Sequence, residues 1–114
     1  MTWKSSIITR EAAVTKTLPP VHPGEVLLED FMKPLGLSTY RVAKDLGVAT
    51  LRISQIVRGQ RAVTADTALR LARYFGTSPE VWMRLQAQYD LEVAQRLLTK
   101  RVEREVKVFQ PSAT

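Results

Sequence analysis

Cysteine is absent from this chain of 114 residues, and histidine occurs once, as His22. Without cysteine the protein has no disulfides, iron–sulfur clusters, thiol nucleophiles or zinc sites with cysteine ligands. A histidine metal site or a Ser-His-Asp triad would have to form around one imidazole ring, and we expect His22 simply to begin a helix. The sequence therefore predicts no enzyme, no catalytic residue, no metal site and no cofactor.

Long apolar runs are also missing from the sequence. No run approaches the roughly 18 residues of a membrane span, and the start MTWKSSIITR lacks the apolar stretch of a secretory signal. We therefore expect a cytoplasmic protein with no membrane partner. Hydrophobic residues make up 45% of the chain and charged residues 25%, which predicts a folded domain.

The charges are unevenly distributed along the chain. The formal net charge is +6. Residues 38–61 contain five Lys or Arg side chains and one Asp, whereas the preceding residues 22–37 contain three acidic side chains and one Lys. Many basic proteins bind no nucleic acid, so the total charge is a weak signal. A basic stretch beside an acidic one favours an anionic partner on one face and a different partner on the other.

Capping residues, glycines and prolines divide the chain into five predicted helices, so we expect an all-α fold. The helices are expected from Pro23 to the stop signals Pro34 and Gly36, from Ser38 to Gly47, from about Thr50 to Val57, from Thr64 to Gly76 and from Ser78 to Leu98. Their apolar spacing predicts a core that contains Val26, Phe31, Ile53, Leu69, Phe75 and Trp82.

Three parts of the chain differ in pattern. Residues 1–20 show no helical period and end in two prolines, so we expect an N-terminal arm. Residues 21–98 are expected to form the helical domain. Residues 99–114 are expected to form a short C-terminal tail, in which the alternation of Val106 and Val108 fits either a short strand or a frayed helix end.

The segment 39–58 has the pattern of a helix-turn-helix, with a plain α-hairpin as the less favoured alternative. This motif needs a small residue where its helices cross and a turn residue that tolerates positive φ, which Ala43 and Gly47 supply. Val48, Ile53 and Ile56 then face inward. The outward positions of the second helix of the motif are Thr50, Leu51, Arg52, Gln55 and Arg58, of which four can donate hydrogen bonds.

The sequence resembles a known family over about residues 18–98. The segments HPGEVLLEDFMKPLGLSTYRVAKDLGV and RISQIVRGQRAVTADTALRLARYFGTSPEVWMRLQAQYDLE are similar to HigA-type antitoxins, which belong to the Xre or lambda-repressor-like helix-turn-helix group. The resemblance implies a homodimer that binds double-stranded operator DNA at its own promoter. It also implies that the protein neutralises a HigB-type toxin, a RelE-like ribonuclease that acts on mRNA.

The resemblance places the DNA contacts on particular residues. Base reading falls on Thr50, Leu51, Arg52, Ser54 and Gln55, and phosphate binding falls on Thr39, Arg58 and Arg61. Arg52 is suited to guanine and Gln55 to adenine. Two residues depart from the expected pattern: Leu51 is apolar where a polar base reader is common, and Ala49 lacks the side chain of a strong N-cap.

Apolar and acidic residues outside the predicted core indicate where partners could bind. Leu91, Leu97 and Leu98 extend the apolar pattern of the last helix beyond the core, which favours a dimer interface there. The toxin's basic surface would suit the acidic first helix, with Glu25, Glu29 and Asp30, while Trp3 of the arm would anchor the contact. The alternative is that these acids are a solvated face and the arm is an ordinary terminus.

Two other functions remain open at this point. One is a stand-alone Xre-type repressor without a toxin, which the absence of a neighbouring toxin gene would indicate. The other is a helical protein-binding adaptor without DNA contact, although the arginines on the outer face of residues 50–61 argue against it.

Overall fold

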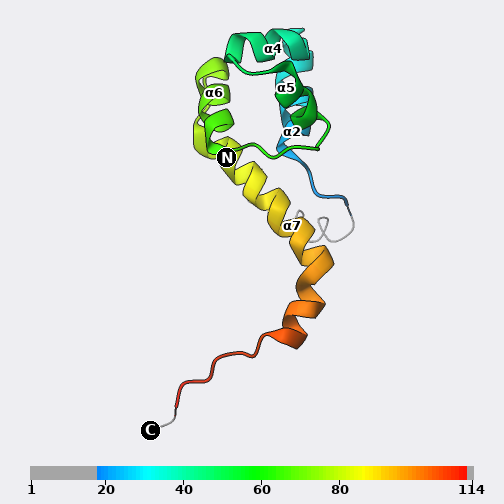
Figure 1. The fold of residues 1–114 in the computed structure, drawn as a ribbon, viewed down its shortest axis with the longest axis vertical. Helices are drawn as coiled ribbons and strands as arrows, with labels where there is room; N and C mark the ends of the chain where they lie inside the picture. Colours follow the sequence, from blue (N-terminus) through cyan, green and yellow to red (C-terminus); the bar gives the residue numbers. More distant parts are fainter. Residues whose placement is uncertain (1–17, 113–114) are drawn as a thin grey trace, which may run out of the picture.

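The computed structural model describes residues 18–112, and all regular structure within that range is helical (Figure 1). The segments are α2 (Pro23–Val26), η1 (Leu27–Met32), α3 (Lys33–Leu35), α4 (Thr39–Leu46), α5 (Thr50–Val57), α6 (Ala65–Phe75) and α7 (Pro79–Glu105). Because α2, η1 and α3 form one continuous run, the described part of the chain contains five helices. This confirms the predicted all-α fold.

The helices begin and end at the capping signals of the sequence. Ser38 Oγ accepts a hydrogen bond from the Arg41 backbone N–H at 3.0 Å, and Thr64 and Ser78 cap α6 and α7 in the same way. Gly47, which ends α4, has a φ of 73°, in the left-handed region where glycine has no Cβ to clash. Each of these signals is local, which is why the sequence alone indicates it.

Pro34 does not end the first helix as expected, because it lies within the helical run, which continues to Leu35. A proline ring normally clashes with the carbonyl four residues earlier. Here the preceding segment η1 is a π-helix, and the Lys33 N–H bonds the carbonyl of Leu28, five residues back. In this wider turn the carbonyl groups are placed differently relative to the Pro34 ring than in an α-helix. The run then ends at Gly36.

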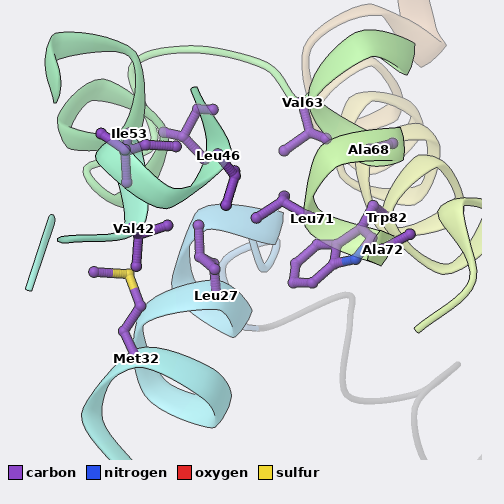
Figure 2. Close-up of a cluster of buried hydrophobic side chains, with 12 residues drawn as sticks. Leu27, Met32, Val42, Leu46, Ile53, Val63, Ala68, Leu71, Ala72 and Trp82 are labelled. Carbon is purple, nitrogen blue, oxygen red and sulfur yellow. The ribbon is translucent and has the colours of Figure 1, made fainter. Parts of the chain in front are cut away.

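The core lies where the first helical run, α4, α5, α6 and the start of α7 meet (Figure 2). Ile53 and Trp82 are fully buried, as expected, and Phe31 and Phe75 pack against the core. The prediction of Leu69 as a core residue is wrong, since Leu69 is 61% exposed. The inner face of α6 instead carries Ala68, Leu71 and Ala72, which lie close to Trp82 in Figure 2.

Helix α7 is longer than the sequence predicts, because it continues to Glu105 instead of ending near Leu98. Its 27 residues span about 40 Å. Trp82 and Gln86 near its start are buried, whereas every residue from 95 to 105 is exposed, and this distal half projects away from the other helices (Figure 1). Residues 106–112 form neither helix nor strand. Thus the helix itself includes the first part of the expected tail.

A buried glutamine fastens the loop between α5 and α6 to α7. Gln86 Oε1 accepts a hydrogen bond from the Val63 backbone N–H at 2.7 Å, and Gln86 Nε2 donates to Asp90 Oδ1 at 2.9 Å. Both ends of the amide are therefore satisfied although its side chain is buried. The loop that follows α5 is thus held by a specific polar contact as well as by Val63 in the core.

His22 begins the first helix, as the sequence analysis expects. Its Nδ1 accepts a hydrogen bond from the Gly24 backbone N–H at 2.9 Å, and its ring packs edge-on against Tyr89, with 4.8 Å between ring centroids. Burial lowers the pKa of His22 below its usual value near 6.5, and the negative charge of Asp90 opposes this shift only in part. The neutral ring is therefore the form that caps the helix.

We expect the free energy of unfolding to decrease as the pH falls below about 6.5. Between the folded and the unfolded pKa of His22, the unfolded chain binds more protons, so acidification favours unfolding. Urea titrations at pH 7.5 and 5.5 measure the difference. His22→Asn keeps a capping acceptor without a titration and should reduce this pH dependence; an unchanged dependence in the variant would assign it to other groups.

Candidate DNA-binding site

Helices α4 and α5 form the predicted helix-turn-helix. The turn between them is closed by a hydrogen bond from the Val48 N–H to the Ala43 carbonyl at 3.0 Å, and Gly47 takes the left-handed conformation within it. Ala43 is fully buried, as a crossing point between close helices requires, and Ile53 and Ile56 are fully buried on the inner side of α5. The side of α5 opposite Ile53 and Ile56 therefore faces solvent.

The predicted base-reading residues lie on the first two turns of α5. Thr50 and Leu51 are exposed, and Arg52, Ser54 and Gln55 are half-buried. Ala49 is the N-cap, and its side chain makes no capping bond, in agreement with the weak cap that the sequence indicates. None of the five side chains belongs to the buried core.

The predicted phosphate-binding residues flank this face. Thr39 is the first residue of α4 and is half-buried, while Arg58 and Arg61 follow α5 and are exposed. Arg61 Nε donates a hydrogen bond to Gln55 Oε1 at 2.9 Å, which places the loop arginine beside a base-reading residue. Within residues 18–112, neither Arg58 nor Arg61 forms an ion pair, so their charges remain uncompensated there.

Arg52 has a partner that the sequence analysis missed. Its Nη1 donates to Asp66 Oδ2 at 2.8 Å, and Arg70 Nε donates to the same oxygen at 3.1 Å. Hydrogen bonds from Arg70 and Arg52 lower the pKa of the Asp66 carboxyl below its usual value. Asp66 and Arg70 share a face of α6 by their i, i+4 spacing, but Arg52 is 14 residues away, so no local pattern indicates this contact.

A second carboxylate connects α4 with α6. Asp45 Oδ2 accepts hydrogen bonds from Tyr74 Oη at 2.5 Å and Arg41 Nε at 2.7 Å. These bonds, that from Tyr74 first, lower the pKa of Asp45 below its usual value. Among the described residues, this ion pair compensates the charge of Arg41, unlike those of Arg58 and Arg61.

The predicted toxin-binding acids are exposed on the first helical run. Glu25, Glu29 and Asp30 all face solvent, although Glu29 forms an ion pair with Lys33 at 2.8 Å. Trp3 lies outside the described residues. These acids therefore form an accessible but partly compensated negative surface on a helix other than α5.

The three leucines predicted at a dimer interface are all exposed on α7, but they do not share one face. Successive helical residues are rotated by about 100°, so Leu97 and Leu98 point in different directions. Leu91 and Leu98, seven residues apart, lie on one side of the helix. We define the α7 stripe by the apolar residues on that side, which are Met83, Ala87, Leu91, Ala94, Leu98 and Val102. Leu91 and Leu98 are 54% and 42% exposed.

The described residues also bear on metal and membrane binding. No group of three or more His, Asp or Glu side chains in residues 18–112 comes together in a way that could hold a metal ion. In the same range, no helix combines the length and the apolar character needed to cross a bilayer.

Comparisons with known proteins agree with this geometry. The helix-turn-helix family matches residues 28–82. Virulence-associated protein I of Dichelobacter nodosus is 52% identical over 79 residues, which cover 69% of this chain and 73% of that protein.

Two solved structures identify the subgroup of helix-turn-helix proteins that this chain resembles. An addiction module antidote protein of the HigA family from Coxiella burnetii is 43% identical with a TM-score of 0.76, and the match covers 81% of this chain and all of that one. Pseudomonas aeruginosa antitoxin HigA, solved with the higBA promoter, is 40% identical with a TM-score of 0.77 over 80% of this chain and 99% of that one. These two relatives are thus an antidote protein of the HigA family and an antitoxin. The chain belongs to the HigA-type antitoxins of the helix-turn-helix family.

Proposed function

We propose that this protein binds operator DNA as a homodimer, represses its own operon, and binds and neutralises a HigB-type ribonuclease toxin. The observation that carries the DNA-binding role is the exposed polar face of α5, followed by Arg58 and Arg61, two arginines without ion-pair partners among residues 18–112. The relative from Pseudomonas aeruginosa, solved with its promoter, supports this role.

In this proposal the first two turns of α5 enter the major groove, where base edges can be distinguished. Arg52 donates to guanine O6 and N7, Gln55 pairs with adenine, and Leu51 contacts a thymine methyl group. Thr50 and Ser54 contact the edges of neighbouring bases. Thr39, Arg58 and Arg61 bind phosphates and set the position of α5. Two copies of this short helix read half-sites about 34–36 Å apart.

Arg52→Ala is expected to weaken operator binding by about 1–3 kcal/mol, because the variant cannot make a bidentate contact with guanine. The effect should be confined to specific DNA, and base preference should relax at one base pair in each half-site. Fluorescence anisotropy titrations with the operator and with random DNA measure both effects at one stated salt concentration.

Arg58→Ala serves as the contrasting variant. A phosphate contact should contribute equally on operator and random DNA, and its removal should reduce the log–log salt slope by roughly 1 for each phosphate that is no longer neutralised. If Arg52→Ala weakened binding to both DNAs equally, Arg52 would be a phosphate contact. An unchanged salt slope for Arg58→Ala would place Arg58 away from the DNA.

The dimer in this proposal forms through the distal part of α7. The α7 stripe is apolar and continues beyond the core, and the exposed residues from 95 to 105 take no part in the core that the described residues form. A second copy of the same helix would bury Leu91 and Leu98 by twofold symmetry. Leu97, at 76% exposed, lies beside this stripe and would contribute at its margin.

The toxin contact is proposed on the first helical run, at Glu25, Glu29 and Asp30, with Trp3 as an apolar anchor. A ribonuclease that holds RNA on a basic surface would be blocked by a partner that offers negative charge there. The acids lie on a different helix from α5. One chain would therefore hold toxin and DNA through separate surfaces.

Co-expression with the product of the adjacent gene tests the antitoxin role. We expect the two proteins to purify together, and the toxin's mRNA cleavage to stop when this protein is added. Glu25→Lys with Glu29→Lys should weaken the complex while operator binding persists. If toxin binding survives this reversal and deletion of residues 1–17, the toxin binds elsewhere. If no adjacent product binds, the protein is a stand-alone repressor.

A further inference from the structure

A chain of hydrogen bonds runs along the outside of the helix-turn-helix and ends at a predicted base reader. Arg70 Nη1 donates to the Leu46 carbonyl at the end of α4, at 2.9 Å. Its Nε donates to Asp66 Oδ2, which also accepts a hydrogen bond from Arg52 Nη1. Two residues one turn apart on α6 therefore contact both helices of the motif. Arg70 binds the backbone of α4, and Asp66 binds the Arg52 side chain of α5.

Stability does not explain this arrangement. The side chains of Arg52, Asp66 and Arg70 are 32%, 55% and 42% exposed, and ion pairs so accessible to water contribute little to folding. Their geometric effect is larger, because a long and flexible arginine is held in one direction by a carboxylate on another helix. Asp66 engages one of the five guanidinium N–H groups of Arg52 and leaves the others for a ligand.

The charge of Asp66 also decides which ligand suits Arg52. Base edges present uncharged acceptors, such as guanine O6 and N7, whereas a phosphate carries a full negative charge. An arginine that keeps its bond to Asp66 can still donate to a base. A phosphate bound by Arg52 would bring its negative charge close to the Asp66 carboxylate, whereas a guanine edge brings no net charge. The aspartate therefore penalises the unspecific contact more than the specific one.

We propose that Asp66 is a specificity-determining residue that acts by positioning Arg52 for base contact. This inference rests on the proposed DNA-binding function. In it, Asp66 touches no base. It raises the ratio of operator affinity to random-DNA affinity by holding the guanidinium in place and by rejecting the phosphate backbone.

The test is Asp66→Asn, which removes the charge and keeps the size of the side chain. The affinity ratio between operator and random DNA should fall by about fivefold or more, toward the lower end of what one arginine–guanine contact discriminates. Binding to random DNA should stay equal or become tighter. Selection from a randomised operator should show relaxed preference at the same base pair that Arg52→Ala relaxes. Asp66→Ser, a second neutral variant, should behave alike.

Asp45→Asn is the matched control. Asp45 is also an aspartate bound by an arginine, but it lies on the Arg41 and Tyr74 side of α4. Removing its charge should alter binding to both DNAs equally and leave the ratio unchanged. In an Arg52→Ala background, Asp66→Asn should no longer change the ratio, because the side chain through which it acts is gone.

Two results would overturn the inference while leaving the proposed function intact. One is an unchanged affinity ratio in Asp66→Asn and Asp66→Ser, whether or not overall affinity rises. The other is an equal fall of the ratio with and without Arg52, which would give Asp66 a general structural role. If the unmodified protein fails to discriminate operator from random DNA, the proposed function is wrong, and this inference falls with it.

Discussion

Replacing Gly24 with alanine is expected to lower the free energy of unfolding by about 3 kcal/mol or more, which is a large part of the roughly 5–15 kcal/mol of a typical domain. Helix propensity alone predicts the opposite sign, since alanine is the better helix former by about 1 kcal/mol. Packing decides the result. A Cβ on Gly24 would lie 1.7 Å from the Ile56 carbonyl oxygen and 2.5 Å from its carbon.

These are backbone atoms of α5, so no side-chain rotation can relieve the clash. The first helix would have to move away from α5 and open the core around Leu27 and Ile56. Urea titrations should show a lower midpoint with an unchanged slope if the variant still unfolds in two states. A variant that fails to fold at all would agree with the same cause.

Gly36→Ala is the matched control for this prediction. Gly36 has a φ of 65°, but a Cβ there would meet nothing within 4 Å. Its cost is therefore only the left-handed backbone strain, about 1–2 kcal/mol. If Gly24→Ala proved no more destabilising than Gly36→Ala, the close approach of the two helices would not be a constraint on the fold.

The second large effect is expected from Leu91→Glu combined with Leu98→Glu. Two charges on the α7 stripe would have to be buried in the proposed dimer, so the protein should become a folded monomer. Operator affinity should fall by about a hundredfold or more, because each half-site would be bound without the gain from linkage. Sedimentation equilibrium measures the mass, and anisotropy titration with the operator measures the affinity.

Gln88→Glu with Thr99→Glu adds the same charge on exposed positions of α7 outside the stripe. This control should remain a dimer and bind the operator with nearly unchanged affinity. A dimer in the leucine variant would move the interface to another surface. Monomers in both variants would mean that charge on α7, and not disruption of the apolar stripe, prevents association.

The parts of the fold that the sequence predicted depend on local chemistry. Ser38 and Thr64 cap helices, and Gly47 takes a positive φ, because neighbouring backbone atoms alone impose these requirements. The helix-turn-helix followed from the same signals together with Ala43 and the inward-facing isoleucines. Such features need no knowledge of distant residues.

The features that the sequence did not predict depend on distant contacts. Leu69 and Leu71 are equally apolar, but only Leu71 lies on the side of α6 that packs against the other helices. Gly24 has the pattern of an ordinary residue of the first helical turn, yet its role is set by the backbone of Ile56. The Arg52–Asp66 pair likewise joins residues of two helices. The sequence therefore predicts site residues but not the contacts that orient them, such as that between Arg52 and Asp66.

The projecting half of α7 has a consequence for how the size of this protein is measured. The radius of gyration is 17.9 Å, whereas a compact chain of this length would have one of about 13 Å. Such an elongated particle diffuses slowly for its mass. On a gel-filtration column calibrated with spherical standards, a single chain would elute early and resemble a pair. For this shape, a mass derived from the elution volume would be too high and would suggest a dimer. Light scattering measures the mass independently of shape.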